Sequence, residues 1–505
     1  MRGFNTLLFV LFALSANAAD GTLGTVSVQK GNNVSVNGEA PLSLTLDGKD
    51  HQSCQFLSKR APDESHEFTW KEVTTTRGGE LAEILGDQLR SVDSLVVKGN
   101  VNDKDFHAMW DASLYGYLSV INLKNAVLEN NAVPDTAFFH ENEQYEGSSH
   151  EIFYYIGLRK IILPEGLEKI GEGAFYQASA LRQVNFPSTL RYIGDFAFNA
   201  TKLEMNQLVI PEGVEEINQY AFAFCRKLKA QVTLPSTIKK IGEWAFYGCP
   251  ITSINLPEGL ESLGSLAFWD CDLREVSIPS SCHEFNEGWQ FGFNRNLEKM
   301  HLPEGMTEIP DHFAVDCFRL REVNFPHILK HIGEKAFSLC ISLKNVDLPL
   351  GMQSLGEEAF SELEALEQIV FPASMKSLGK NSCSYWKNIK RIYCAAMEPP
   401  VCDPTDGGVF SGFDFPDGLN TPVVYVPKGS INKYKDPSRN CMGWEKFWNY
   451  VEIDPSEFPT TAIDSPAIVE TLSKDNSVYD LMGRKVERPQ KGNIYIQNGK
   501  KFVAK

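Results

Sequence analysis

Apolar and polar positions recur in one order, with a period of about 23 residues, over the middle of the chain. In most copies apolar residues stand six, three and one positions before a proline, Ile-Gly or Leu-Gly six and seven after it, and Ala-Phe ten and eleven after it. Ten prolines mark the copies, at positions 164, 187, 211, 235, 257, 279, 303, 326, 349 and 372. A period of this length predicts supersecondary units that must stack to bury their apolar faces.

One copy, "LRQVNFPSTLRYIGDFAF", illustrates the unit. Its apolar residues Leu181, Val184 and Phe186 should point inward while Gln183 and Asn185 alternate outward, as in a short strand. Proline then ends the strand because it cannot donate to a ladder. We expect the following glycine to supply a tight turn and the phenylalanine to fill the interior. The units should stack strand beside strand into a solenoid.

These residues resemble the bacterial leucine-rich-repeat proteins of the BspA-like type, whose repeat has the form LxxVxLPxxLxxIGxxAFxxCxxL. The resemblance covers roughly residues 75 to 453. It implies a leucine-rich-repeat solenoid of the α/β repeat class, β-rich with short helical turns and with small β segments at both ends. It also implies a surface protein of Bacteroidota. The copy after Pro279 is the most irregular, since Trp289 and Gln290 stand where Ala-Phe is expected.

The flanking stretches predict further segments. We expect a signal peptide over 1–19, a small β segment over 20–74, an N-terminal cap with the first irregular repeats over 75–163, repeats over 164–394, a C-terminal cap over 395–453 and a Pro/Ser/Thr-rich linker over 454–474. Residues 475–505 predict a strand and a hairpin around Asn498-Gly499. This ending is similar to the C-terminal sorting segments of the type IX secretion route.

Hydropathy and net charge indicate where the protein is located in the cell and which classes of partner it can bind. The apolar run near the N-terminus is shorter than the ~20 residues that a bilayer span needs, so we expect a secreted or outer-surface protein without a transmembrane segment. The formal net charge is −17 and the pI is about 5.2. Phosphate binding needs clustered Lys and Arg, so a nucleic-acid partner is not expected.

The 11 cysteines follow the repeat. Five of them lie 14 residues after a repeat proline, at Cys225, Cys249, Cys271, Cys317 and Cys340. Coils about 4.8 Å apart hold such residues farther apart than the ~3.8 Å between the Cβ atoms of a disulfide, which favours buried thiols over bridges. Cys394 and Cys402 flank a loop and are the better candidates for a disulfide. No Cys-x-x-Cys pair occurs, so no metal site is expected.

No catalytic constellation is found. The sequence lacks His-Glu-x-x-His, Gly-x-Ser-x-Gly and a phosphate-binding Gly-Lys-Ser/Thr loop. Cys282 and His283 are adjacent in the irregular copy, but a nucleophile and its base are usually distant in sequence, so a tolerated substitution is favoured there. We therefore expect neither an enzyme nor a cofactor.

Two columns of side chains are candidates for binding. The first lies on the exposed strand face, where amides and hydroxyls dominate and aromatic rings are absent from the repeat positions; its members are Gln183, Asn185, Gln207, Gln231, Thr233, Asn255, Glu275, His301 and Asn324. Such a face can hydrogen-bond a protein or peptide, and it lacks the rings on which sugars stack. The alternative is a merely solvated strand face.

The second column lies nine residues after the proline, where four consecutive copies carry Phe196, Tyr220, Trp244 and Leu266. We expect this position to point outward and to form an apolar ridge, since aromatic residues are favoured interface anchors. The alternative is that the ridge packs under a neighbouring turn or under the N-terminal segment. By resemblance, the protein should bind an extracellular host or bacterial protein in the manner of an adhesin. The competing function is a glycan-binding component of a surface nutrient-acquisition system.

Overall fold

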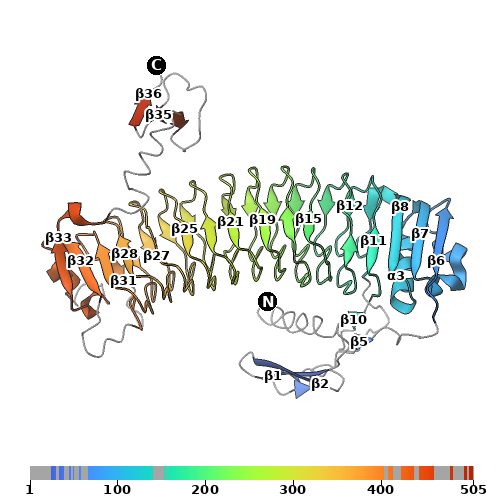
Figure 1. Cartoon of the computed structure of the whole chain (residues 1–505), viewed down its shortest axis with the longest axis horizontal. Coiled ribbons are helices and arrows are strands. Elements are labelled where there is room, and N and C mark those ends of the chain that lie inside the picture. The colour runs from blue at the N-terminus through green and yellow to red at the C-terminus, as the bar shows by residue number, and fades with distance from the viewer. Residues whose placement is uncertain are drawn as a thin grey trace. The chain divides into compact units, whose positions relative to one another are not determined.

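The computed structural model describes residues 66–139, 156–402, 408–412, 422–436 and 443–459, together with the backbone of nine short strands outside these ranges. The chain forms two compact units, Met1–Ile254 and Asn255–Lys505. Each is built from parallel strands that succeed one another coil by coil (Figure 1). The solenoid predicted from the repeat is therefore confirmed. No helix in the described ranges is long and apolar enough to cross a membrane.

The first unit contains the segment expected to form the N-terminal cap, residues 75–163. A parallel sheet runs in the order β13-β11-β8-β7-β6; of its strands, β6 (Trp70–Thr75) lies at the start of this segment, and β7 (Ser94–Val101) and β8 (Val120–Leu128) lie within it. Helices α2 (Leu81–Leu85), η2 (Gly86–Ser91) and α3 (Asp103–Tyr115) lie between these strands in sequence. The buried Asp105 carboxylate accepts the N–H groups of Gly79, Leu81 and Asn102 at 2.7, 3.0 and 2.9 Å, which ties α3 to the loop before α2.

The repeats of the first unit carry two parallel strand rows. The exposed strand face consists of β11 (Lys160–Ile162), β13 (Gln183–Val184), β15 (Gln207–Val209) and β17 (Gln231–Thr233), and β19 (Ser253–Asn255) lies at the unit boundary. The second row consists of β9 (Ala132–Val133), β12 (Lys169–Ile170), β14 (Tyr192–Ile193), β16 (Glu216–Ile217) and β18 (Lys240–Ile241), with η3 (Glu129–Asn131) just before β9. Each coil thus has a strand on either side of the proline.

The second unit continues the same alternation. Its first row contains β21 (Glu275–Ser277), β23 (Lys299–His301), β25 (Glu322–Asn324), β28 (Gln368–Phe371), β30 (Arg391–Cys394), β32 (Val423–Pro427) and β33 (Tyr450–Ile453). Its second row contains β20 (Ser262–Leu263), β22 (Glu284–Phe285), β24 (Glu308–Ile309), β26 (His331–Ile332), β27 (Ser354–Leu355), β29 (Ser377–Leu378) and β31 (Val401–Cys402). Short helices α4 (Ile431–Tyr434) and η5 (Trp444–Lys446) lie in the segment expected to form the C-terminal cap, and η6 (Pro455–Glu457) lies at the start of the expected linker.

The strands outside these ranges form small antiparallel pairs. β1 (Gly24–Gln29) pairs with β2 (Asn33–Gly38), and β3 (Thr45–Leu46) pairs with β4 (Lys49–Asp50). β5 (Phe56–Leu57) pairs in parallel with β10 (Phe153–Tyr154). At the C-terminus β35 (Ile494–Gln497) lies between β34 (Val478–Asp480) and β36 (Lys500–Val503), and the β35–β36 hairpin spans the expected turn. The expected signal peptide lies outside the described residues.

The return segments differ from the short helical turns that the resemblance implies. Two positions of each described repeat, about nine and 13 residues after the proline, have φ between +51° and +66°, whatever residue stands there. Between them, alternate N–H groups donate to the next coil: those of Phe196 and Phe198 reach the carbonyls of Gln219 and Ala221 at 3.0 and 2.8 Å. The N–H groups of Ala197 and Asn199, in between, donate within the coil to the carbonyls of Gly194 and Phe196 at 3.3 and 3.1 Å. Hydrogen bonds between coils therefore alternate with those of local turns.

The glycine that recurs after Ile or Leu in the repeats also has a different cause from the one expected. A Cβ added at Gly194 would lie 2.6 Å from the backbone nitrogen of Glu172, and one added at Gly242 would lie 2.8 Å from that of Gln219. Neither glycine has a positive φ. Glycine is needed at this position because neighbouring coils approach closely there, and the turn itself does not require it.

The interior is filled by regular columns. Phe138, Phe175, Phe198, Phe222 and Phe246 are fully buried, and their ring centroids succeed one another at 5.2 to 5.3 Å. The cysteine column lies beside them as buried thiols, as expected. These thiols are also donors: Cys225 Sγ lies 3.1 Å from the carbonyl oxygen of Phe198, and Cys249 Sγ lies 2.9 Å from that of Phe222. Thr201 occupies the position of this cysteine column one coil before Cys225, and its hydroxyl donates to the Phe198 carbonyl at 2.9 Å.

The disulfide expected between Cys394 and Cys402 is not formed. Cys394 ends β30 and Cys402 ends β31, and these strands belong to two different sheets. Both thiols are buried, and the Tyr434 hydroxyl lies 3.2 Å from Cys394 Sγ. Closeness in sequence was misleading because the loop between the two residues carries the chain from one strand row to the other.

Successive coils of the repeat are linked in pairs at the proline turns. Copies beginning Pro-Glu-Gly alternate with copies beginning Pro-Ser-Thr or a close variant. The Glu165 carboxylate accepts both the N–H and the hydroxyl of Ser188, at 3.2 and 3.0 Å. The Thr189 hydroxyl accepts the Gly166 N–H at 3.0 Å and donates to the Leu167 carbonyl at 2.7 Å. The true sequence period is thus two coils in this part of the chain.

Candidate functional site

The aromatic ridge, defined as Phe196, Tyr220 and Trp244, is a continuous stack in the first unit. Its ring centroids lie 4.7 and 5.2 Å apart, with interplanar angles of 7° and 16°. All three side chains are half-buried, so their edges reach the surface while their faces cover one another. The outward orientation expected from the sequence is therefore partial.

The ridge residues stand in an unfavourable backbone conformation. Their φ angles are 55°, 55° and 58°, in the left-handed region that bulky residues avoid at a cost of about 1–2 kcal/mol each. The same place is held by Gly173 and Asn381 in other copies, and both residue types tolerate this conformation. Each stacked aromatic pair returns about 0.5–1.5 kcal/mol, so the two stacked pairs recover only part of this conformational cost.

Further rings extend the stack beyond the predicted column. Tyr176 lies edge-on to Phe196 at 5.9 Å, Phe139 lies edge-on to Tyr176 at 4.8 Å, and Tyr247 lies 4.4 Å from Trp244. These rings were missed because they stand 12 residues after the proline, or outside the ten copies, where most repeats carry small residues. An aromatic residue three positions after a ridge residue is the signal that would have identified Tyr247.

The fourth predicted member, Leu266, lies in the second unit. It is half-buried and has the same backbone conformation, with φ of 56°. In the irregular copy this place belongs to Trp289, with φ of 66°, while Gln290 and Phe291 are fully buried in the places of Ala and Phe. The alignment of Trp289 and Gln290 with Ala-Phe was therefore wrong, because the copy contains one additional residue. Trp289 stacks on His312 with centroids 3.6 Å apart.

Acidic residues border the ridge. Glu172, Asp195 and Glu243 stand one position before the ridge column in their copies, and Asp195 accepts the Gln219 N–H at 3.0 Å. Burial, together with the Glu243 carboxylate, raises the pKa of Tyr220 to about 12. Tyr220 therefore stays protonated at neutral pH and can donate to a partner.

The predicted strand-face residues divide into two groups. Asn185 and Asn324 hold neighbouring coils together: each side-chain amide both accepts from and donates to the backbone of the preceding coil, at Leu163 and Leu302, over 2.7 to 3.1 Å. His301 lies 3.5 Å from Glu275. The exposed members Gln183, Gln207, Gln231, Thr233 and Asn255 remain on the solvent side, with Gln207 opposite Gln231 in register.

The strand face does carry rings at the C-terminal cap. Tyr393 and Tyr425 lie opposite each other in β30 and β32, stacked at 4.5 Å and 12°. The row continues with Val370 on one side and Val451 on the other. The sequence columns ended with the last proline repeat and therefore missed this pair.

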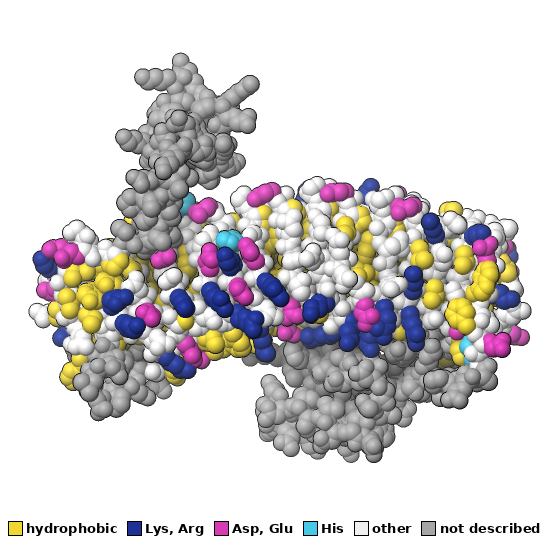
Figure 2. All heavy atoms as spheres, in the orientation of Figure 1, with side chains coloured by type: hydrophobic (Ala, Val, Ile, Leu, Met, Phe, Trp, Pro, Cys, Tyr) yellow, Lys and Arg dark blue, Asp and Glu magenta, His cyan; other side chains and the backbone are white. Residues whose placement is uncertain are grey.

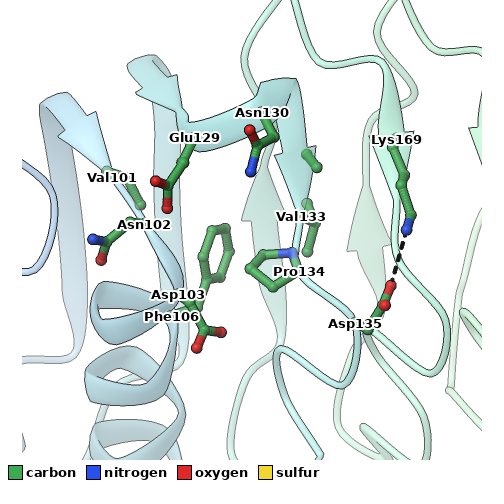
Figure 3. Close-up of a pocket in the computed structure, with 11 residues that line it drawn as sticks. Val101, Asn102, Asp103, Phe106, Glu129, Asn130, Val133, Pro134, Asp135 and Lys169 are labelled. Carbon is green, nitrogen blue, oxygen red and sulfur yellow. Dashed lines mark ion pairs between the residues drawn. The ribbon is translucent and has the colours of Figure 1, made fainter.

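A shallow pocket of about 280 Å³ lies between the N-terminal cap and the first repeats. Figure 3 shows the Phe106 ring next to Pro134 among the residues that line the pocket, which include Glu129 and Asp103. Lys169 pairs with Asp135, with 3.2 Å between Lys169 Nζ and Asp135 Oδ1. No serine, cysteine or histidine lines it. The described residues contain no cluster of His, Cys, Asp and Glu placed to hold a metal ion.

The adjacent pair Cys282 and His283 lacks the geometry of a nucleophile and its base. Burial, and secondarily Glu284, raises the pKa of the Cys282 thiol to about 12. His283 is exposed, and its Nδ1 lies 2.6 Å from the carbonyl oxygen of Ser281. The thiol is therefore protonated at neutral pH, which agrees with a tolerated substitution in the repeat.

These features define a leucine-rich-repeat solenoid. Residues 148–232, 229–338 and 312–397 match the model of the BspA type leucine rich repeat region, so this part of the chain is similar to BspA-type leucine-rich repeats. No curated protein matches the sequence.

Solved leucine-rich-repeat structures are similar to the chain. A leucine-rich repeat protein from Bacteroides ovatus is 20% identical, with a TM-score of 0.46, and the match covers 74% of this chain and 93% of that one. A leucine rich cell surface protein from Faecalibacterium prausnitzii is 21% identical, with a TM-score of 0.31 and coverage of 52% and 83%. The leucine-rich-repeat protein of T. pallidum is 29% identical, with a TM-score of 0.29 and coverage of 32% and 77%.

Proposed function

We propose that this protein is secreted or held on the outer surface of a Bacteroidota cell and binds an extracellular protein of a host or a neighbouring bacterium, in the manner of an adhesin. The proposal includes removal of residues 1–19 as a signal peptide and a sorting role for residues 475–505. Its interaction site is the aromatic ridge. The repeats of this chain build regular surface columns, and solenoids use such surfaces for binding.

The observation that supports this function is the aromatic stack of the ridge. The positive φ at this position belongs to the repeat, because it occurs there whatever residue is present. In the first unit, however, three consecutive copies fill the position with stacked aromatic rings. Tyr and Trp are enriched among the residues that dominate binding energy at interfaces, and the half-exposed edges of Tyr220 and Trp244 are available to a partner.

The test replaces the rings without disturbing the turn. The double variant Tyr220→Asn, Trp244→Asn keeps a residue type that tolerates the left-handed conformation, as Asn381 does at the equivalent place. Wild-type and variant chains are compared on a panel of immobilised extracellular-matrix proteins and on a glycan array. We expect the wild-type chain to bind at least one matrix protein and the variant to lose at least tenfold in affinity, which corresponds to about 1.4 kcal/mol.

The matched control is Lys335→Asn, Glu358→Asn, which changes the same column in the second unit. It should bind like the wild type. Binding to glycans with none to proteins would contradict the adhesin-like function and favour a glycan-binding component of nutrient acquisition. Equal losses in both double variants would contradict the assignment of the site to the ridge.

A further inference from the structure

Lys and Arg residues are segregated in the repeats of the first unit. The segments that lead into β11, β13, β15 and β17, residues 156–160, 176–183, 199–207 and 223–231, contain one acidic residue, Glu204. They contain seven basic residues, which we call the basic edge: Arg159, Lys160, Arg182, Lys202, Arg226, Lys227 and Lys229. Figure 2 shows Lys and Arg side chains gathered along one edge of the molecule. This local excess is opposite in sign to the net charge of −17 of the whole chain.

Most of these cations are open to solvent. Arg159, Arg182, Arg226, Lys227 and Lys229 are exposed. Arg182 is paired with Glu204, at 2.5 Å, and both side chains are nearly half-exposed. No ion pair joins Arg159, Lys227 or Lys229 to a carboxylate among the described residues. Exposed cations without a local counter-charge keep their attraction for an external anion.

Arg226 is held in place by its surroundings. Its guanidinium carbon lies 5.5 Å from the centroid of the Phe224 ring. A Cβ added at Gly248 in the next coil would lie 3.0 Å from the same carbon, so the arginine occupies the space that a side chain there would need. A pre-ordered guanidinium loses less conformational entropy when it binds an anion, and its planar donors suit oxyanions such as sulfate and carboxylate.

We propose that the basic edge binds a linear sulfated polysaccharide. The four segments belong to successive coils about 4.8 Å apart, so the cations form a row roughly 14 Å long. Such a row fits an extended, flexible polyanion with closely spaced charges, and Lys/Arg-rich stretches such as "CRKLK" at 225–229 are typical of heparin patches. A rigid duplex nucleic acid would extend beyond the row and meet a surface of net negative charge. The basic edge differs from the aromatic ridge in residues and in chemistry.

The experiment uses the full mature chain and heparin as the probe. We expect binding at 150 mM NaCl that weakens steeply as salt rises, because each ion contact releases counterions. The variant Lys227→Gln, Lys229→Gln should weaken the affinity about tenfold or more, since each Lys or Arg near an anionic surface contributes about fivefold. De-sulfated heparin should bind at least tenfold more weakly than heparin.

The matched control is Lys239→Gln, Lys240→Gln, which removes the same charge from the same coil on the other side of Pro235. It should keep the affinity within twofold, as should Tyr220→Asn, Trp244→Asn. The proposal is overturned if heparin does not bind at 150 mM NaCl, if the control loses as much as the edge variant, or if a 20-base-pair duplex DNA binds the edge as tightly as heparin. Since both lysines of the edge variant are exposed, its unfolding temperature should match that of the wild type and exclude misfolding.

Discussion

At the scale of one residue, Asn199 is a buried polar side chain that lowers the free energy of unfolding. It is fully buried, and neither its side-chain oxygen nor its nitrogen has a hydrogen-bond partner. Ala223 holds the same place in the next coil. The variant Asn199→Ala should therefore raise the free energy of unfolding, by about 1–2 kcal/mol, because an unsatisfied buried amide is removed. Chemical denaturation of both chains measures the difference.

Asn294 is the matched control for this prediction. It is also fully buried, but its amide nitrogen donates to the carbonyls of Phe268 and Phe291 at 2.7 and 2.8 Å. Asn294→Ala should lower the free energy of unfolding by about 1–3 kcal/mol, because these carbonyls lose their donor. Changes of the same sign in the two variants would contradict the argument.

His312 makes stability depend on pH. Burial lowers its pKa from the ordinary 6.5, while Glu334 opposes the shift. Between the folded and the unfolded pKa the unfolded chain binds more protons, so stability falls as pH drops below about 6.5. The variant His312→Phe keeps a ring against Trp289 and removes this titration. Its unfolding temperature should fall less between pH 7.5 and pH 5.5 than that of the wild type, and an equal fall in both chains would show that His312 does not contribute.

At the scale of one coil, the glycine after Ile is the position least able to change. A Cβ at Gly194 would lie 2.6 Å from the Glu172 nitrogen, and backbone atoms of a stacked coil cannot move independently. Gly194→Ala should lower the free energy of unfolding by about 1–3 kcal/mol through overpacking. The control Gly305→Ala adds the same methyl group where nothing lies within 4 Å, and it should stay within about 0.5 kcal/mol. Equal effects, measured by thermal unfolding, would contradict the close-packing explanation.

The sequence predicted which residues of a coil form strands and which are buried, but it did not predict the contacts between coils that explain these positions. Strand positions, inward Phe residues and buried thiols follow from periodicity, because each copy repeats the same environment. Three features depend on atoms one coil away, about 23 residues distant in sequence. They are the need for glycine after Ile or Leu, the positive φ of Tyr220 and the pairing of Glu165 with Ser188. Period alone could not reveal them. The additional residue before Trp289 shifted one copy by one position, which concealed a member of the ridge column.

At the scale of the whole molecule, the charge of the chain was a poor guide to its surface. The net value of −17 led us to expect no site for a polyanion of phosphates, yet the first unit concentrates seven Lys and Arg residues in segments with a single Glu. In a solenoid, residues at the same position of successive repeats lie next to one another in a row. Basic and acidic residues that are mixed along the sequence can therefore lie on different parts of the surface.

The C-terminal cap should decide whether the second unit remains folded. Trp444 is fully buried against Phe410 and Tyr434, with ring centroids 4.8 and 5.2 Å away, and β33 pairs with β32 just after it. A chain that ends at residue 459 keeps these contacts and should unfold at the wild-type temperature.

A chain that ends at residue 436 lacks Trp444 and β33. Loss of one buried Trp costs about 3–5 kcal/mol, so its unfolding temperature should fall by roughly 10 °C, with aggregation through the uncovered strand β32. If the shorter chain were as stable and monomeric as the longer one in calorimetry and light scattering, residues 443–459 would not be the cap.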